Sequence, residues 1–104
     1  MSTTKPSAAQ ARAHNLFKIV KQQHAEVNQL ERQPDLSVAD REEAATLHEH
    51  IAMSYQALAE VYPFAAKLWN GLASREYGKA ARHQVAMFYS TAEPVAEVEE
   101  VLAA

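Results

Sequence analysis

Proline and glycine divide this chain into segments, and apolar residues recur at helical spacing within each segment. The dividing residues are Pro34, Pro63, Gly78 and Pro94. Between them, apolar side chains recur every three or four positions, which places them on one side of an α-helix. A chain of 104 residues is long enough for one domain and too short for two ordinary ones. The sequence therefore predicts a single all-α domain over residues 1–104.

The clearest pattern is an antiparallel helical hairpin formed by residues of about 8–32 and 38–62. Each segment follows a serine, Ser7 or Ser37, whose hydroxyl can cap the free amides of a first helical turn. The stripes consist mainly of apolar residues: Ala9, Ala13, Leu16, Val20, Gln23, Val27 and Leu30, then Ala44, Leu47, Ile51, Ser54, Leu58 and Val61. Because Pro34 ends the first helix and the connection is short, the two helices should be neighbours. Folding about this turn pairs Val27 with Ala44, Val20 with Ile51, and Ala13 with Leu58.

The rest of the chain predicts two or three shorter helices packed on the hairpin. Pro63 permits two interpretations, a kink in one long helix or the first position of a new one. An interior proline costs about 3 kcal/mol, which favours a break. We expect Gly78 to end the next helix as a C-cap. A further helix is expected over about 79–91, with a last short stretch after Pro94.

Composition limits the class of protein. The absence of cysteine excludes disulfides, thiolate metal sites and cysteine nucleophiles. The polar start is followed by no apolar run of signal-peptide length, and no stretch is long enough to span a membrane. We therefore expect a cytoplasmic protein that does not enter the membrane.

Charge is unevenly distributed along the chain. Residues 1–92 hold ten lysines and arginines against nine acidic residues, whereas residues 93–104 hold four glutamates and no basic residue. A nearly neutral body with an acidic tail lacks the basic excess of general nucleic-acid binders. We expect flexible ends over residues 1–6 and about 94–104.

The five histidines do not form a metal-binding motif along the sequence. They are His14, His24, His48, His50 and His83. Two ligands on one helix face need a spacing of three or four residues, usually with supporting carboxylates. His48 and His50 are two apart and point to different faces. We predict no metal, no cofactor and no catalytic residue. A histidine-based metal sensor stays open as an alternative, and it requires His83 to approach another ligand.

Arg41 and His48, seven residues apart, resemble the arginine–histidine motif of HEPN domains, which are small helical bundles. The resemblance implies a ribonuclease in which these two side chains act together. This alternative requires His48 to approach Arg41.

Trp69-Asn70-Gly71, with Tyr89 and Glu93 downstream, resembles the signals of the WXG proteins exported by type VII secretion. The resemblance implies a helical-hairpin partner protein whose Trp-X-Gly string forms the turn between the two helices. It is a second alternative function.

The favoured function follows largely from the absence of a catalytic set and of a cofactor loop, together with aromatic and charged residues that look exposed, among them a cationic stripe at Arg75, Lys79 and Arg82. If Gly78 does not break the helix, these cations could bind a phosphate or an acidic partner helix. Trp69 could extend that surface or anchor the core beneath Tyr62, Phe64 and Phe88. We predict a non-enzymatic interaction module of bacterial type, such as an adaptor, inhibitor, immunity protein or regulatory subunit. An alanine-rich core buries little apolar area, so we also predict a homodimer or a heteromeric complex.

Overall fold

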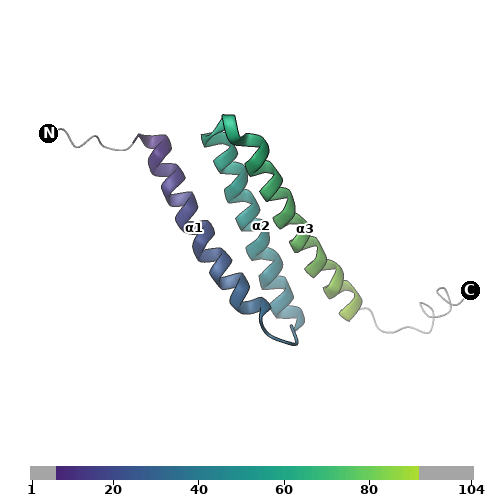
Figure 1. The fold of residues 1–104 in the computed structure, drawn as a ribbon. Coiled ribbons are helices and arrows are strands. Elements are labelled where there is room, and N and C mark those ends of the chain that lie inside the picture. Colours follow the sequence, from purple (N-terminus) through teal and green to yellow (C-terminus); the bar gives the residue numbers. More distant parts are fainter. Residues whose placement is uncertain (1–6, 92–104) are drawn as a thin grey trace, which may run out of the picture.

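The computed structural model describes residues 7–91, which form three long helices and one short 3₁₀ turn. The elements are α1 (Ala8–Glu31), α2 (Val38–Val61), η1 (Pro63–Ala65) and α3 (Ala66–Thr91). They lie side by side, with α2 between α1 and α3 (Figure 1). The predicted all-α class is confirmed, and so is the hairpin of α1 and α2.

Serine caps begin both helices of the hairpin. The Ser7 hydroxyl accepts from the Gln10 amide at 3.1 Å, and the Gln10 side chain accepts from the Ser7 amide at 2.9 Å. Ser37 and Asp40 make the same pair of hydrogen bonds at the start of α2. Each capping box satisfies amides that the first turn leaves free, which explains why both helices begin where the sequence predicts.

The α1–α2 interface has the predicted stripes at its centre. Val20, Val27, Ala44 and Ile51 form one buried cluster. Ala13 and Leu58 are also buried, toward the other end of the hairpin.

The α2–α3 interface consists largely of alanine. Ala45, Ala52 and Ala59 recur every seven residues on α2, Ala73 and Ala80 do so on α3, and all five are buried. Small side chains allow two helices to approach closely, and α2 packs more extensively against α3 than against α1. The backbones of α1 and α3 do not approach each other, so side chains alone bridge these two helices.

The segment after Val61 differs from its prediction in one respect. Pro63 breaks the helix as expected, with Tyr62 outside helical torsions. Gly78 does not end the next helix: α3 continues through it for 26 residues, and neither glycine has a positive φ. One long helix therefore spans the two helices predicted on either side of Gly78, and the short stretch expected after Pro94 lies outside the described residues. The buried positions continue at helical spacing across Gly78, and this packing outweighs the cost of about 1 kcal/mol for a helical glycine.

Residues 1–6 and 94–104, whose flexibility the sequence predicts, lie outside the described residues. None of the described helices has an apolar stretch long enough to cross a membrane.

Candidate functional site

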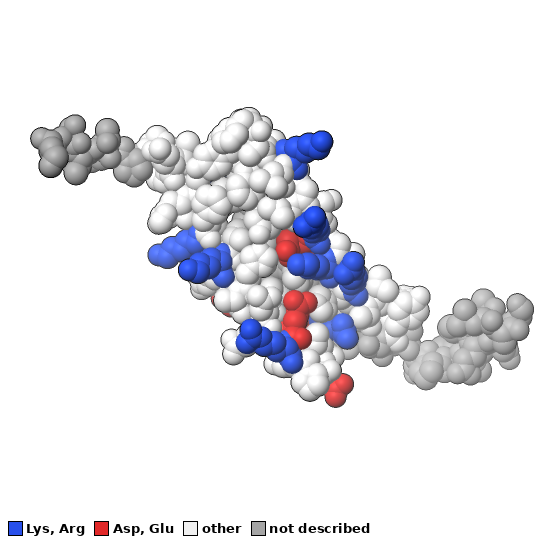
Figure 2. Space-filling view, in the orientation of Figure 1, with Lys and Arg blue, Asp and Glu red and all other residues white. Residues whose placement is uncertain are grey.

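The three cations singled out in the sequence lie on the outer surface of α3. All three are exposed. Lys67, eight residues before Arg75 on the same helix, is exposed as well. The single acidic residue of α3, Glu76, is only 4% exposed. The exposed surface of α3 thus carries cations without a carboxylate, and lysine and arginine side chains gather over α3 on the face drawn in Figure 2.

Apolar side chains continue this surface at both ends. Leu68 and Tyr89 are 60% and 71% exposed, and they lie seven residues from Arg75 and Arg82 respectively. A seven-residue spacing drifts by only about 20° around a helix, so the four side chains form one stripe. A shallow groove of about 200 Å³ lies beside it, lined by Lys67, Leu68, Gly71, Leu72 and Arg75.

Trp69 lies on the inner side of α3, away from this stripe. Its ring contacts Phe17 of α1 edge-on at 5.6 Å and stacks on Tyr55 of α2 at 6.0 Å. These are not the neighbours that the sequence suggests for a core tryptophan. The Trp69-Asn70-Gly71 string is helical and forms no turn.

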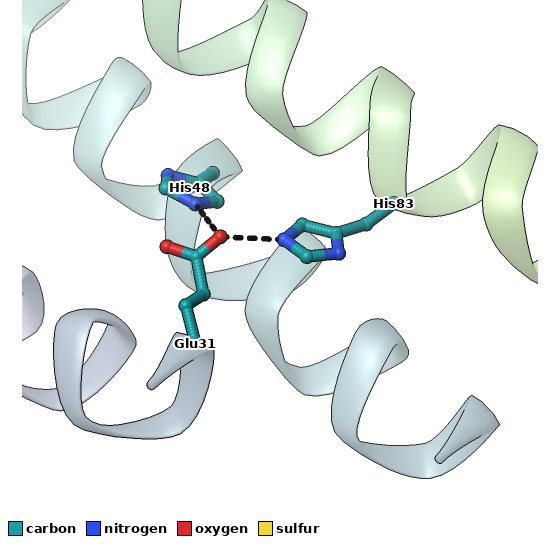
Figure 3. A group of neighbouring side chains, drawn as sticks. All are labelled: Glu31, His48 and His83. Carbon is teal, nitrogen blue, oxygen red and sulfur yellow. Dashed lines mark hydrogen bonds and ion pairs between the residues drawn. The ribbon is translucent and has the colours of Figure 1, made fainter. Parts of the chain in front are cut away.

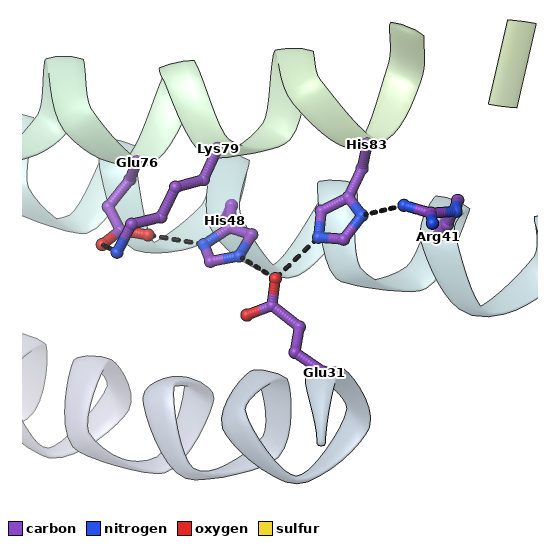
Figure 4. A network of polar contacts seen from close by, with 6 residues as sticks. All are labelled: Glu31, Arg41, His48, Glu76, Lys79 and His83. Atoms are coloured by element: carbon purple, nitrogen blue, oxygen red, sulfur yellow. Dashed lines mark hydrogen bonds and ion pairs between the residues drawn. The ribbon is translucent and has the colours of Figure 1, made fainter. Parts of the chain in front are cut away.

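A buried polar network lies farther along the same inner side, centred on His48 (Figure 4). His48 is 2% exposed, and both of its ring nitrogens face carboxylates. Its Nδ1 lies 2.6 Å from Glu76 Oε2, and its Nε2 lies 3.2 Å from Glu31 Oε2. Lys79 Nζ donates to the other Glu76 oxygen at 3.3 Å.

His83 extends the network to Arg41. Its Nε2 lies 2.6 Å from Glu31 Oε2, and its Nδ1 lies 3.4 Å from the Arg41 guanidinium. The His48 and His83 rings are nearly parallel, with centroids 5.8 Å apart. Arg41, which the HEPN resemblance pairs with His48, is instead a neighbour of His83.

Hydrogen-bond chemistry assigns the protons of this network. A guanidinium only donates, so His83 Nδ1 accepts from Arg41 and the proton on its Nε2 is donated to Glu31. A neutral imidazole can donate to only one carboxylate, whereas both ring nitrogens of His48 face one, Glu76 at Nδ1 and Glu31 at Nε2. Burial raises the pKa of Glu31, but hydrogen bonds from His83 and His48, with a smaller electrostatic contribution from the two rings, outweigh it and hold the pKa below its usual 4.5.

A second polar contact links α1 to α2 between the aromatic residues and the network. Tyr55 Oη and His24 Nε2 are 3.0 Å apart. Burial, with a further contribution from the negative charge of Glu76, raises the pKa of Tyr55 above 10.0. This contact keeps the Tyr55 ring against Trp69.

Three residues of the network have the chemistry of metal ligands. Glu31, His48 and His83 each offer one ligand atom, and these atoms lie within 4.8 Å of one another (Figure 3). The other histidines do not join them: His14 and His50 are exposed, and His24 bonds Tyr55.

Sequence inspection missed this group because it searched for ligand pairs on one helix, whereas these residues come from three. A signal was present. His48 lies between Ala45 and Ala52, and Glu76 and His83 flank Ala80, all at spacings of three or four residues. Polar residues that interrupt a stripe of alanines occupy buried positions, and buried polar groups need partners.

Comparison with protein-family models, curated proteins and solved structures gives no match.

Proposed function

We propose that this chain is a helical interaction module that binds an acidic, partly apolar helix along the outer surface of α3. One observation carries the proposal: the exposed surface of α3 has four cations, whereas its one carboxylate is buried against α2. Arg75 and Arg82 make no ion pair with any described residue. Both are therefore free to pair with carboxylates of a partner.

The pattern of this surface fits a helical partner. Leu68 and Tyr89 place apolar side chains at the ends of the stripe, and Arg75 and Arg82 place cations between them. A partner helix with carboxylates near its middle and apolar residues toward its ends would complement both. A Cβ added at Gly71 or Gly78 would meet no atom within 4 Å, so there is room for a close approach.

The cations of α3 and the net charge of the chain also indicate which class of partner this surface binds. A symmetric α3–α3 contact between two copies would bring cations against cations, which disfavours that mode of dimerisation. The net charge of the whole chain is −3, which disfavours a nucleic acid. An acidic protein partner, in the cytoplasm, is the class that remains. Self-association through another surface stays a separate prediction.

Charge reversal on α3 tests the proposal. The full chain and its Arg75→Glu/Arg82→Glu variant are used for affinity capture from a lysate of the native host, and captured proteins are quantified. Lys18→Glu/Lys21→Glu on α1 is the matched control, because both lysines are exposed and the charge change is the same. We expect one or more acidic helical proteins to be captured by the full chain and by the α1 control, but not by the α3 variant. Equal capture by all three proteins would refute it.

A further inference from the structure

We propose that Glu31, His48 and His83 form a binding site for a divalent transition-metal ion of the zinc class. The site lies on the inner side of α3 and is independent of the interaction proposed for the outer surface. It takes one ligand from each long helix: the carboxylate at the end of α1, and one imidazole each from α2 and α3 (Figure 3).

The donor set is suited to this class of ion. Imidazole nitrogen and carboxylate oxygen are ordinary zinc ligands, and two histidines with one carboxylate form a familiar three-ligand set. Hard cations such as Mg²⁺ and Ca²⁺ prefer sites made only of oxygen. Three protein ligands leave a fourth position for water or an anion. The site therefore favours zinc and its tetrahedral analogue Co²⁺.

One ligand separation already matches a tetrahedral ion, one is shorter, and all three ligand atoms lie within 4.8 Å of one another. Ligand atoms bound at about 2.0–2.1 Å lie about 3.3 Å apart in a tetrahedron. Glu31 Oε2 lies 3.2 Å from His48 Nε2 and 2.6 Å from His83 Nε2. The first distance needs no change. The second is that of a short hydrogen bond, and it lengthens when the metal replaces the shared proton.

Glu76 prepares His48 for this role. Its carboxylate accepts from His48 Nδ1 at 2.6 Å. This contact holds a proton on Nδ1 and directs Nε2 toward Glu31 (Figure 4). A carboxylate behind a histidine ligand fixes the ring and increases its basicity, and losing such a partner typically weakens metal binding 10- to 100-fold. Glu76 is thus a positioning residue and not a ligand.

Arg41, in contrast to Glu76, opposes metal binding. It donates to His83 Nδ1, which keeps the ring proton on Nε2, where the metal has to bind. With metal on Nε2, the proton moves to Nδ1 and Arg41 can no longer donate there. Metal binding must therefore displace Arg41, and removing the guanidinium should tighten binding. A purely structural role for the network predicts no such gain.

The test uses the full chain without a histidine tag, freed of metal with EDTA. Zn²⁺ is titrated by calorimetry and Co²⁺ by visible absorption. We expect one ion per chain, a tetrahedral Co²⁺ spectrum and an unfolding temperature that rises with Zn²⁺. Glu31→Gln and His83→Gln should each weaken binding at least 10-fold, whereas Arg41→Gln should strengthen it several-fold. Circular dichroism verifies that each variant is folded.

Exposed histidines provide the matched controls. His14→Gln and His50→Gln remove the same chemical group outside the site and should bind like the unmodified chain. Three results would overturn the proposal: no binding at one ion per chain, equal affinity of folded Glu31→Gln and the unmodified chain, or equal losses in the two control variants. Capture experiments with the α3 surface have no bearing on any of these outcomes.

Discussion

At the scale of single residues, the most constrained position is His48. Its ring is enclosed by the α2–α3 interface and faces Glu31 on one side and Glu76 on the other. A charged hydrogen bond in such surroundings contributes more than a neutral one, and loss of one partner leaves the other buried without compensation. The stability of this region therefore depends on a few polar contacts.

Removing the charge of Glu76 should measure that dependence. Glu76→Gln takes away the carboxylate that faces both His48 and Lys79, and we expect a loss of about 1–3 kcal/mol in the free energy of unfolding. Urea denaturation in EDTA provides the measurement. Glu60→Gln is the control, since Glu60 pairs with Arg12 on the surface and its loss should be small. Equal midpoints for the two variants would contradict the prediction.

Glu31 gives the protein an acid-sensitive contact. Its pKa is lower in the folded chain than the usual 4.5, so the unfolded chain binds more protons as the pH falls toward and below that value. The stabilisation is present above pH 4.5 and is lost as the pH falls through the folded pKa. We expect Glu31→Gln to flatten the acid limb of a stability–pH curve measured in EDTA. An acid limb as steep as that of the unmodified chain would rule out this contribution.

At the scale of helices, the sequence was informative where one helix meets its neighbour in the chain. The stripes through Val20 and Ile51 predict the α1–α2 pair, because a short connection leaves little choice of partner. Gly78 was misleading, since a glycine ends a helix only if the chain turns there. Here α3 continues through Gly78, because Ala73 and Ala80 on either side of it pack on α2. The local sequence around Gly78 does not reveal this packing. The histidine site depends on all three helices, so sequence spacing could not reveal it.

Glycine at position 78 therefore lowers the stability of α3 although the structure does not require a glycine there. It has a helical backbone, and an added Cβ would meet no neighbouring atom. Gly78→Ala should raise the free energy of unfolding by about 0.5–1 kcal/mol, because alanine restricts the unfolded chain and favours the helix. Thermal unfolding followed by circular dichroism checks this. A lower unfolding temperature would show that the position does not tolerate a side chain.

The alanine interface should be intolerant of larger residues. Ala52 is fully buried where α2 meets α3. Ala52→Leu would force the two helices apart and should cost about 1–3 kcal/mol of stability. Ala81→Leu makes the same change on the exposed side of α3 and should have little effect. Chemical denaturation measures the free energy of unfolding of both variants. Equal losses for Ala52→Leu and Ala81→Leu would mean that the close α2–α3 packing does not cause the destabilisation.

At the scale of the whole molecule, the helices of residues 7–91 leave much apolar surface uncovered. Met53, Phe64 and Val85 are among the large side chains that remain exposed. This agrees with the expectation that an alanine-rich core provides limited burial, and it keeps self-association as a prediction. Light scattering after size exclusion should give more than the mass of one chain at micromolar concentration. A strict monomer would leave the exposed side chains to a different partner.

The backbone of α1 packs on α2 and not on α3, and this has a consequence for how the molecule opens. Because α1 does not pack its backbone on α3, it can detach without disturbing the alanine interface. Native-state amide exchange often separates such parts into units of different protection. Amides of α1 should exchange faster than those of the α2–α3 pair. The chain would then lose its order in two steps, with its first helix leaving earlier.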